Sequence, residues 1–399
     1  MKIAVIGGGA AGMMAALTAA QQGAEAVLLE RQPRVGRKLL ATGNGRCNLT
    51  NRHASAEHYH GAEPAFVRPA LEAFGVEETL AFFAGLGLLT VTEEDGKVYP
   101  FSDQAGSVVD VLRFAVEAAG VTLCTDFSVE KIEPKAHGFL LQAGEKSLTA
   151  DRVILCCGGL AGKQLGGSRS GYDLLAALGH TVTPLTPALV QVRTGTAYVR
   201  SLKGVRADAA VRLCRGDTLL AESAGEVQFT EYGVSGPEIF AISRTAATED
   251  HLMLHLDMLR GYSAAETEAL LAARRSALPR LTLENLLTGT LHNRLGRTLL
   301  RYAGYDLTAP VSSLNGEDDR RIAGAIHDFA LPVTGTMGFD GAQVTAGGAG
   351  TAEFDPNTLQ SRLVPGLYAA GEVLDIDGDC GGYNLQWAWS SGHLAGQTL

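Results

Sequence analysis

The first glycine cluster constrains the fold of this chain more than any other feature. It follows a short apolar run, Lys2–Ile6, that is typical of a buried parallel strand. It opens a segment rich in Ala, Met and Leu, Ala10–Gln22, that favours a helix. Its glycines at Gly7, Gly9 and Gly12 have the G-x-G-x-x-G spacing, which permits a tight turn and close approach of a pyrophosphate. The pattern predicts a dinucleotide-binding turn, and the alternative is a glycine turn in an ordinary βαβ unit.

An acidic residue stands where the same motif needs one. Glu30 lies 18 residues after Gly12 and ends a second apolar run, Ala26–Glu30. A carboxylate at this place binds ribose hydroxyl groups and disfavours a 2′-phosphate. The ligand expected at this turn is therefore FAD or NAD rather than NADP.

The composition narrows the class of protein. The 399 residues carry a formal net charge of −10, which argues against a nucleic-acid-binding protein with a basic face. Hydrophobic residues make up 46%, yet no apolar run reaches the ~20 residues that span a bilayer. The 6 cysteines have irregular spacings that predict neither a disulfide framework nor a metal site. We expect a cytoplasmic protein with a small-molecule substrate, without nucleic-acid or membrane partners, whose oligomeric state the sequence leaves open.

Two further segments are dense in glycine and polar residues. Residues 37–51 combine a flexible backbone, amide side chains and cations, which suits a long anionic ligand, with a polar surface loop as the alternative. Residues 366–388 run from an apolar strand into Gly381-Gly382 and then into a helix from about Tyr383. Free N–H groups at that helix N-terminus would stabilise negative charge on a reduced flavin. Here the alternative is a glycine turn followed by a core helix.

Taken together, these segments resemble the BaiN-like FAD flavoproteins, a family that includes aminoacetone oxidases and a bile-acid 4,6-reductase. The matching motifs are GGGAAG at 7–12, TGNGRCNLTN at 42–51, FTEYGVSGP at 229–237 and GLYAAGEVLDIDGDCGGYNLQWAWSSG at 366–392. The resemblance covers nearly the whole chain, and the last two motifs are specific. Residues 160–173 depart from the family pattern, which affects the substrate side rather than the flavin site.

The resemblance implies both the fold and the domains. It implies an α/β protein with a glutathione-reductase-like, Rossmann-type FAD-binding domain made from residues 1–187 and 333–399. Residues 188–332 would be an insert over the flavin, with a small β-barrel part (188–250) and a mainly helical subdomain (251–332). The expected FAD-binding residues are Gly7, Gly9, Ala10, Ala11, Gly12, Glu30, Arg31, Lys38, Asn44, Gly45, Arg46, Cys47, Asn48, Val129, Cys157, Gly158, Gly371, Glu372, Asp375, Gly382, Tyr383, Asn384, Leu385 and Gln386.

Several side chains have two interpretations. Cys47 and Cys380 could form a redox pair, with Arg46 lowering the pKa of the first thiol, but a packing role is favoured. His180 is expected to cap a helix or lie at the surface rather than transfer a proton. No residue is singled out as catalytic, and both tryptophans, Trp387 and Trp389, are expected in the core.

The resemblance implies an FAD-dependent oxidoreductase whose flavin N5 exchanges a hydride with an organic substrate. The favoured version is an NAD(P)H-linked reductase of activated C=C bonds in bile-acid-like or steroid-like molecules. The alternatives are an aminoacetone-type amine oxidase that uses O2 and a non-catalytic flavin redox sensor. Because the sequence has only one complete G-x-G-x-x-G, NADH or NADPH is expected to enter the substrate's pocket, unless Ser168 and Arg169 belong to a second phosphate loop.

Overall fold

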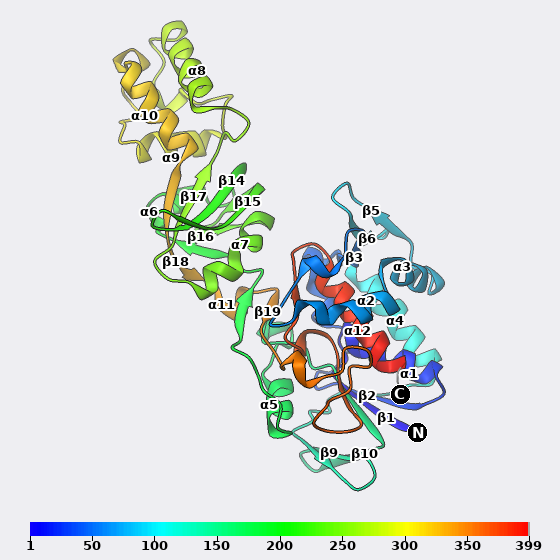
Figure 1. The fold of residues 1–399 in the computed structure, drawn as a ribbon. Helices are drawn as coiled ribbons and strands as arrows, with labels where there is room; N and C mark the ends of the chain where they lie inside the picture. The colour runs from blue at the N-terminus through cyan, green and yellow to red at the C-terminus, as the bar shows by residue number, and fades with distance from the viewer. Residues whose placement is uncertain (398–399) are drawn as a thin grey trace. The chain divides into compact units, whose positions relative to one another are not determined.

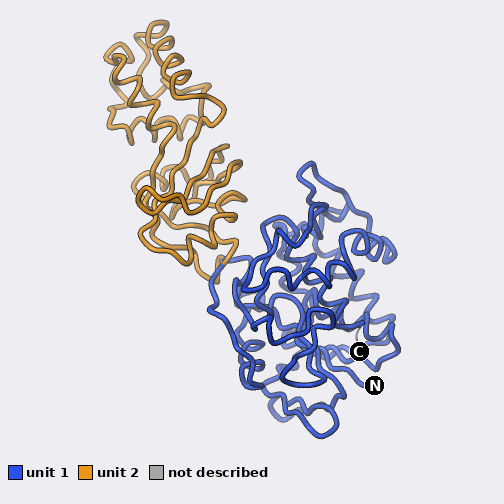
Figure 2. The backbone as a smooth tube through the Cα atoms, viewed as in Figure 1, with its two compact units in different colours: residues 1–187, 342–399 blue, residues 188–341 orange. Residues whose placement is uncertain are grey.

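The computed structural model describes residues 1–397, which divide into two compact units (Figure 2). One unit is made from residues 1–187 together with the chain from 342 onward, and the other is residues 188–341. The second unit therefore ends nine residues later than the predicted insert, which was expected to stop at 332. The reason is that strand β18 (Phe329–Thr336) pairs within the second unit.

A five-stranded parallel sheet organises the first unit. Its strand order is β20 (Leu367–Ala369), β11 (Arg152–Leu155), β1 (Lys2–Ile6), β2 (Glu25–Leu29) and β7 (Thr122–Cys124). In the centre, Val5 aligns with Ile154 on one side and with Leu28 on the other. All three side chains are fully buried, as expected for apolar strands covered on both faces. The predicted Rossmann-type α/β fold is confirmed.

Helices α1 (Ala10–Gln21) and α12 (Tyr383–Gln397) bring the two ends of the chain together (Figure 1). They approach closely because α12 presents glycine to the backbone of α1. A Cβ on Gly392 would overlap the carbonyl oxygen of Ala11, and one on Gly396 would lie 2.6 Å from that of Ala15. The C-terminal motif is thereby placed beside the N-terminal one, and both tryptophans of α12 are buried as predicted.

The remaining elements of the first unit surround this core. Strand β8 (Lys131–Pro134) belongs to a separate three-stranded antiparallel sheet. The other elements are α2 (Arg68–Ala73), α3 (Val76–Gly85), α4 (Ala105–Ala118), α5 (Ser170–Ala177), β3 (Thr50–Asn51), β4 (Tyr59–His60), β5 (Thr90–Thr92), β6 (Lys97–Pro100), β9 (Phe139–Ala143), β10 (Lys146–Ala150), β19 (Val344–Ala346) and β21 (Asp377–Gly378). Strand β12 (Thr186–Ala188) pairs with β19 where the chain leaves this unit.

The second unit contains a closed barrel and a helical part. The barrel order is β13 (Val192–Thr194), β16 (Gly233–Ser235), β15 (Thr218–Phe229), β14 (Arg206–Arg215), β17 (Met253–Asp257) and β18. The barrel thus takes strands from both ends of the insert, and not only from the predicted segment 188–250. The helices are α6 (Thr196–Val199), α7 (Pro237–Thr248), α8 (Ala264–Ala277), α9 (Asn293–Tyr302), α10 (Gly316–His327) and α11 (Gly338–Gly341).

Within residues 1–397, none of the helices combines the length and the apolar character that crossing a membrane requires.

Candidate functional site

The glycine turn has one face that the protein leaves open. A Cβ on Gly7 would overlap the carbonyl oxygen of Cys156, and one on Gly12 would overlap that of Gly7, so packing alone requires both glycines. At Gly9, by contrast, an added Cβ would meet no atom within 4 Å. Gly9 caps α1 without a side-chain hydrogen bond, and no acidic residue stands in the first turn at Ala10 and Ala11. The turn therefore presents unsatisfied N–H groups to an anion.

Glu30 lies directly beside this turn. Its carboxylate accepts hydrogen bonds from the backbone N–H of Gly8 at 2.7 Å and from that of Gln32 at 2.7 Å. The neighbouring Arg31 donates to the carbonyl oxygen of Gly166, in the segment that departs from the family pattern. The structure thus brings the acidic residue to the glycine turn, where the ribose of a dinucleotide is expected.

An ion pair joins the middle motif to the C-terminal one. The Nζ of Lys38 lies 2.7 Å from Oε2 of Glu372, and Oε1 of Glu372 accepts a hydrogen bond from the backbone N–H of Thr345 at 2.9 Å. Gly371, just before, adopts a φ of +77° and accepts a hydrogen bond from the Trp387 indole. Residues far apart in the sequence are therefore held at one place in the first unit.

The TGNGRCNLTN segment separates into an outer and an inner part. Asn44 and Gly45 are exposed, and Arg46 forms ion pairs with Glu93 and Asp103 while lying over the Tyr99 ring. The Arg46 guanidinium is therefore paired with two carboxylates at the surface. Sequence reasoning had instead placed it against a thiolate.

Cys47 is fully buried, and burial raises the pKa of its thiol to about 12. The idea that Arg46 lowers this pKa is wrong, because Arg46 pairs with carboxylates and desolvation dominates at the sulfur. Cys47 is thus a packing residue in the folded protein.

We expect the Cys47 thiol to resist alkylation in the native protein, because the thiolate is the nucleophile and burial suppresses it. Iodoacetamide labelling at pH 8, followed by peptide mass spectrometry, should modify Cys47 only after unfolding in urea. Equal labelling rates in the native and unfolded protein would contradict this expectation.

Next to Cys47, one buried polar atom has no partner in the protein. The Oδ1 of Asn48 accepts no hydrogen bond, although it is shielded from solvent. It lies against the glycine loop that enters α12, because a Cβ on Gly382 would be 2.9 Å from it. A buried acceptor without a donor is costly, so this atom marks a place for a hydrogen-bond donor from a ligand.

The first residues of α12 make different kinds of contact. The side-chain amide of Asn384 bonds back to the loop, to the N–H and carbonyl of Gly378 at 2.8 and 2.7 Å and to the carbonyl of Asp379 at 3.2 Å. Tyr383 stacks on His58, and Leu385 packs against the hydrophobic core. Asn384 therefore shapes the loop in this structure.

Gln386 is fully buried and bonded only to protein. Its Oε1 accepts from Thr50 at 2.6 Å, and its Nε2 contacts Phe74 O at 3.2 Å, Thr79 Oγ1 at 3.0 Å and Ser390 Oγ at 2.9 Å. The family resemblance implied that Gln386 binds the flavin. In the structure its amide joins β3, α2, α3 and α12.

Four further expected residues lie around the sheet. Val129 is buried in the core, as is Asp375, whose Oδ2 lies 3.4 Å from the N–H of Ala62. Burial raises the pKa of the Cys157 thiol to about 12. Gly158 has a φ of +69° and open space beside it, so the backbone after β11 can approach a ligand.

In residues 160–173, the two side chains considered for a second phosphate loop both have local partners. Ser168 accepts a hydrogen bond from the N–H of Ser170 at 3.1 Å, and Arg169 pairs with Asp173 at 3.0 Å. Both side chains therefore bond to residues in the first turn of α5.

His180 is not a surface residue, which corrects that part of the prediction, but its backbone N–H does cap the end of α5 by donating to the carbonyl oxygen of Leu175 at 3.0 Å. Its side chain is 0% exposed, with Nδ1 at 2.8 Å from Glu353 and Nε2 at 3.0 Å from Ser361 Oγ. That hydroxyl also accepts from the N–H groups of Leu363 and Val364, at 3.1 and 2.9 Å. The Ser–His–Glu arrangement is thus a buried structural link, in which the hydroxyl is occupied.

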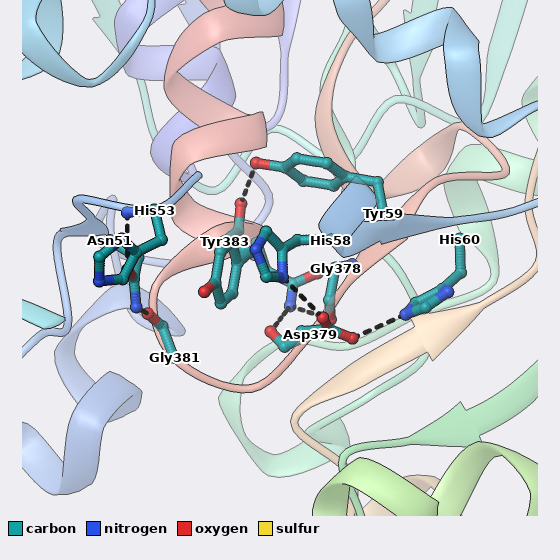
Figure 3. A network of polar contacts seen from close by, with 10 residues as sticks. Asn51, His53, His58, Tyr59, His60, Gly378, Asp379, Gly381 and Tyr383 are labelled. Carbon is teal, nitrogen blue, oxygen red and sulfur yellow. Dashed lines mark hydrogen bonds and ion pairs between the residues drawn. The ribbon is translucent and has the colours of Figure 1, made fainter. Parts of the chain in front are cut away.

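Sequence reasoning missed a cluster around the C-terminal loop. Asp379 lies between His58 and His60, at 3.0 and 2.7 Å (Figure 3). The signal in the sequence was a pair of alternating histidines, but nothing in it linked them to residue 379.

The fold and the site define the class of protein. A parallel sheet with a G-x-G-x-x-G turn, an acidic residue after β2 and a C-terminal glycine loop beside them make this an FAD-dependent oxidoreductase of the Rossmann type. The chain belongs to the family described as HI0933-like protein Rossmann domain, which it matches over residues 1–398.

Two relatives match along the whole chain. It is 42% identical to the 3-dehydro-bile acid delta(4,6)-reductase of Clostridium scindens, over 100% of this chain and 98% of that protein. It is 30% identical to the Ribosomal RNA dihydrouridine synthase of Escherichia coli, over 99% of this chain and 97% of that protein. The family resemblance seen in the motifs is confirmed.

A solved structure supports the fold. The 3-ketosteroid-delta4-(5alpha)-dehydrogenase of Rhodococcus jostii aligns with a TM-score of 0.51 and 17% identity, over 99% of this chain and 96% of that one.

Proposed function

We propose that this chain is an FAD-dependent reductase of C=C bonds conjugated to a carbonyl group, with a bile-acid-like or steroid-like ketone as substrate and NADH or NADPH as electron donor. The observation that carries the proposal is the 42% identity, over the whole chain, to a protein named as a 3-dehydro-bile acid delta(4,6)-reductase. A 3-oxo bile acid with double bonds at positions 4 and 6 is a conjugated ketone, in which the carbonyl activates the C=C bond for reduction.

The residues present fit FAD. The open face of Gly9 leaves room for a pyrophosphate, and Glu30 lies beside the same turn, where it can bind the ribose. Near the start of α12, the buried Oδ1 of Asn48 has no hydrogen-bond donor in the protein and can accept one from the cofactor. When bound and reduced, the flavin supplies a hydride at N5. The chain's own contribution is to hold the dinucleotide at these points and to position the substrate and its proton.

We expect Glu30→Ala to weaken FAD binding by about 1–3 kcal/mol, because the ribose loses its charged hydrogen-bond acceptor. Calorimetric titration of the apoprotein with FAD measures the loss. Glu25→Ala is the matched control, since Glu25 is exposed and begins the strand that Glu30 follows. Equal affinities for FAD in the two variants would contradict the assignment of Glu30.

Anaerobic spectroscopy tests the proposed reaction. Bleaching of the bound flavin by NADH or NADPH, followed by its recovery on addition of a 3-oxo bile acid with 4,6 double bonds, is the expected result. Bleaching by aminoacetone with release of peroxide in air would support an amine oxidase instead. Absence of turnover with any donor would support a redox sensor.

A second candidate follows from the relative that is 30% identical over nearly the whole chain and is named a Ribosomal RNA dihydrouridine synthase. Dihydrouridine is uridine with its C5=C6 bond reduced, and that bond is also conjugated to a carbonyl, so the chemistry is the same. The net charge of −10 favours the small molecule. Incubation of the reduced protein with rRNA and mass analysis of its nucleosides distinguishes the two, since reduction adds the mass of two hydrogens.

A further inference from the structure

The loop before α12 carries a carboxylate shared by two imidazoles (Figure 3). Asp379 Oδ2 lies 3.0 Å from Nδ1 of His58, and Oδ1 lies 2.7 Å from Nε2 of His60. The backbone supports the same arrangement, because β4 pairs with β21 and the N–H of Asp379 donates to the carbonyl of His58 at 2.9 Å. The three side chains are thus positioned by main-chain pairing as well as by their own hydrogen bonds.

The loop before α12 is fixed by several hydrogen bonds, so the position of the Asp379 carboxylate is defined. Asn384 bonds to the main chain of Gly378 and Asp379, and the side-chain amide of Asn51 donates to the carbonyl of Gly381 at 2.9 Å. A Cβ on Gly382 would lie 2.5 Å from the carbonyl group of Thr50, so the loop packs flat against β3. This preorganisation is what an acid–base group requires.

The imidazole of His58 lies beside the first residue of α12. Its ring stacks on that of Tyr383, the first residue of the helix, with centroids 4.3 Å apart and an interplanar angle of 23°. The hydroxyl of Tyr59 donates to the carbonyl of Tyr383 at 3.0 Å. The same helix start faces the orphaned Oδ1 of Asn48 across Gly382. The imidazole therefore stacks on the first residue of the helix whose preceding glycine lies against this buried acceptor.

Stability does not explain this cluster. The side chains of His58, His60 and Asp379 are 32%, 42% and 42% exposed, whereas the His180 side chain in its carboxylate pair is 0% exposed. Solvent-exposed ion pairs contribute only about 0–1 kcal/mol. A held imidazole that reaches solvent can, however, exchange protons with water between turnovers.

We propose that His58, oriented by Asp379, is the proton donor of the reduction, and that His60 positions Asp379 from its other side. The inference rests on the proposed function. In this step FAD, when bound and reduced, would supply a hydride to the carbon far from the carbonyl and would itself be oxidised. The C=C electron pair shifts to the carbonyl as an enolate, and the proton of His58 Nε2 goes to the carbon next to the carbonyl. The product gains two hydrogens, and His58 recovers its proton from solvent.

The charges around the imidazole suit this role. Burial alone would raise the pKa of Asp379, but hydrogen bonds from His60 and His58 lower it below its usual value, so the carboxylate stays ionised beside the two imidazoles. Burial and the charge of Asp379 raise the pKa of Tyr383, which keeps the stacked phenol neutral. The other titratable groups facing this place are Tyr59, His60, Asp95, Lys97 and Cys380.

The test separates hydride transfer from protonation. His58→Gln keeps a planar side chain that can donate to Asp379 but has no proton to give at neutral pH, and Asp379→Asn removes the charge behind the imidazole. The matched control is His255→Gln, which makes the same change in a 2.7 Å histidine–carboxylate pair with Asp328 in the second unit. Each FAD-loaded protein is reduced anaerobically with dithionite, and reoxidation is timed with a 3-oxo-4,6-diene bile acid, or with 2-cyclohexenone if wild type does not accept it.

We expect His58→Gln to slow reoxidation by about 100- to 10,000-fold, with FAD content and melting temperature unchanged. Asp379→Asn should slow it less, and the pH profile of the rate should differ between wild type and His58→Gln. Nitrogen-15 NMR of the apoprotein gives a readout without turnover: Asp379→Asn should shift the Nδ1 resonance of His58, because the hydrogen-bond partner of that nitrogen changes, and His255→Gln should not.

The two proposals can fail separately. If wild-type flavin is reoxidised by the ketone and His58→Gln reacts within twofold of the rate of His255→Gln, the proton-donor assignment is wrong while the reductase proposal stands. The assignment is also wrong if His58→Gln loses FAD and stability in proportion to rate, because that result indicates a structural link. If no conjugated ketone reoxidises wild type, the proposed function fails and the proton-donor role fails with it.

Discussion

Replacing Gly9 with alanine should leave the fold intact and lower the affinity for FAD by about 100-fold, which corresponds to roughly 2.8 kcal/mol. The backbone at Gly9 has φ −81° and ψ −167°, which alanine adopts without strain, and no protein atom lies within 4 Å of the added Cβ. The methyl group would instead occupy the face at which a pyrophosphate approaches the turn. Calorimetry on the apoprotein and the flavin retained after gel filtration measure the effect.

Gly12→Ala provides the contrast. Its Cβ would overlap the carbonyl oxygen of Gly7 and lie 3.3 Å from Cβ of Cys156, so this variant should lose both stability and FAD. Gly9→Ala, in contrast, should change the free energy of unfolding by less than about 1 kcal/mol. Wild-type FAD affinity in Gly9→Ala would mean that the pyrophosphate does not lie at this face.

Gln386→Leu should lower the free energy of unfolding of the apoprotein by about 3–5 kcal/mol. The substitution leaves the buried hydroxyl groups of Thr50 and Thr79 without this partner, and each buried group that loses its hydrogen bond carries a desolvation cost of about 1–3 kcal/mol. Urea denaturation measures the loss as a lower midpoint at unchanged slope.

Gln22→Leu is the matched control for this prediction, because Gln22 is exposed after the end of α1 and its replacement should cost less than about 0.5 kcal/mol. If Gln386→Leu keeps the wild-type midpoint but loses FAD, then Gln386 contacts the flavin as the sequence predicted. The structure favours the first outcome, since the amide is fully buried and bonded to protein.

The sequence predicted correctly the features that neighbouring residues specify, and it was wrong where distant residues decide the structure. The strand, turn and helix around Gly7–Gly12 are specified by neighbouring residues, and so is the helix that begins at Tyr383; both lie where the sequence placed them. The end of the insert was set too early, because β18 is placed by its pairing with β13 and β17, which lie far from it in the sequence. Arg46 was assigned to the wrong partner for the same reason: Glu93 and Asp103 lie about 50 residues further along the chain.

The sequence alone determined the fold class, the family and the place of the glycine turn with Glu30, because a strand, a tight turn and a helix N-terminus each depend on the residue types within a few positions. Only the tertiary structure decided which polar side chains face one another. His58 and Asp379 are 321 residues apart, and His180 and Glu353 are 173 apart. Nothing in the residue types distinguishes the exposed pair from the buried one. The difference arises from burial and from strand pairing, such as that of β4 with β21, which depend on how distant segments pack.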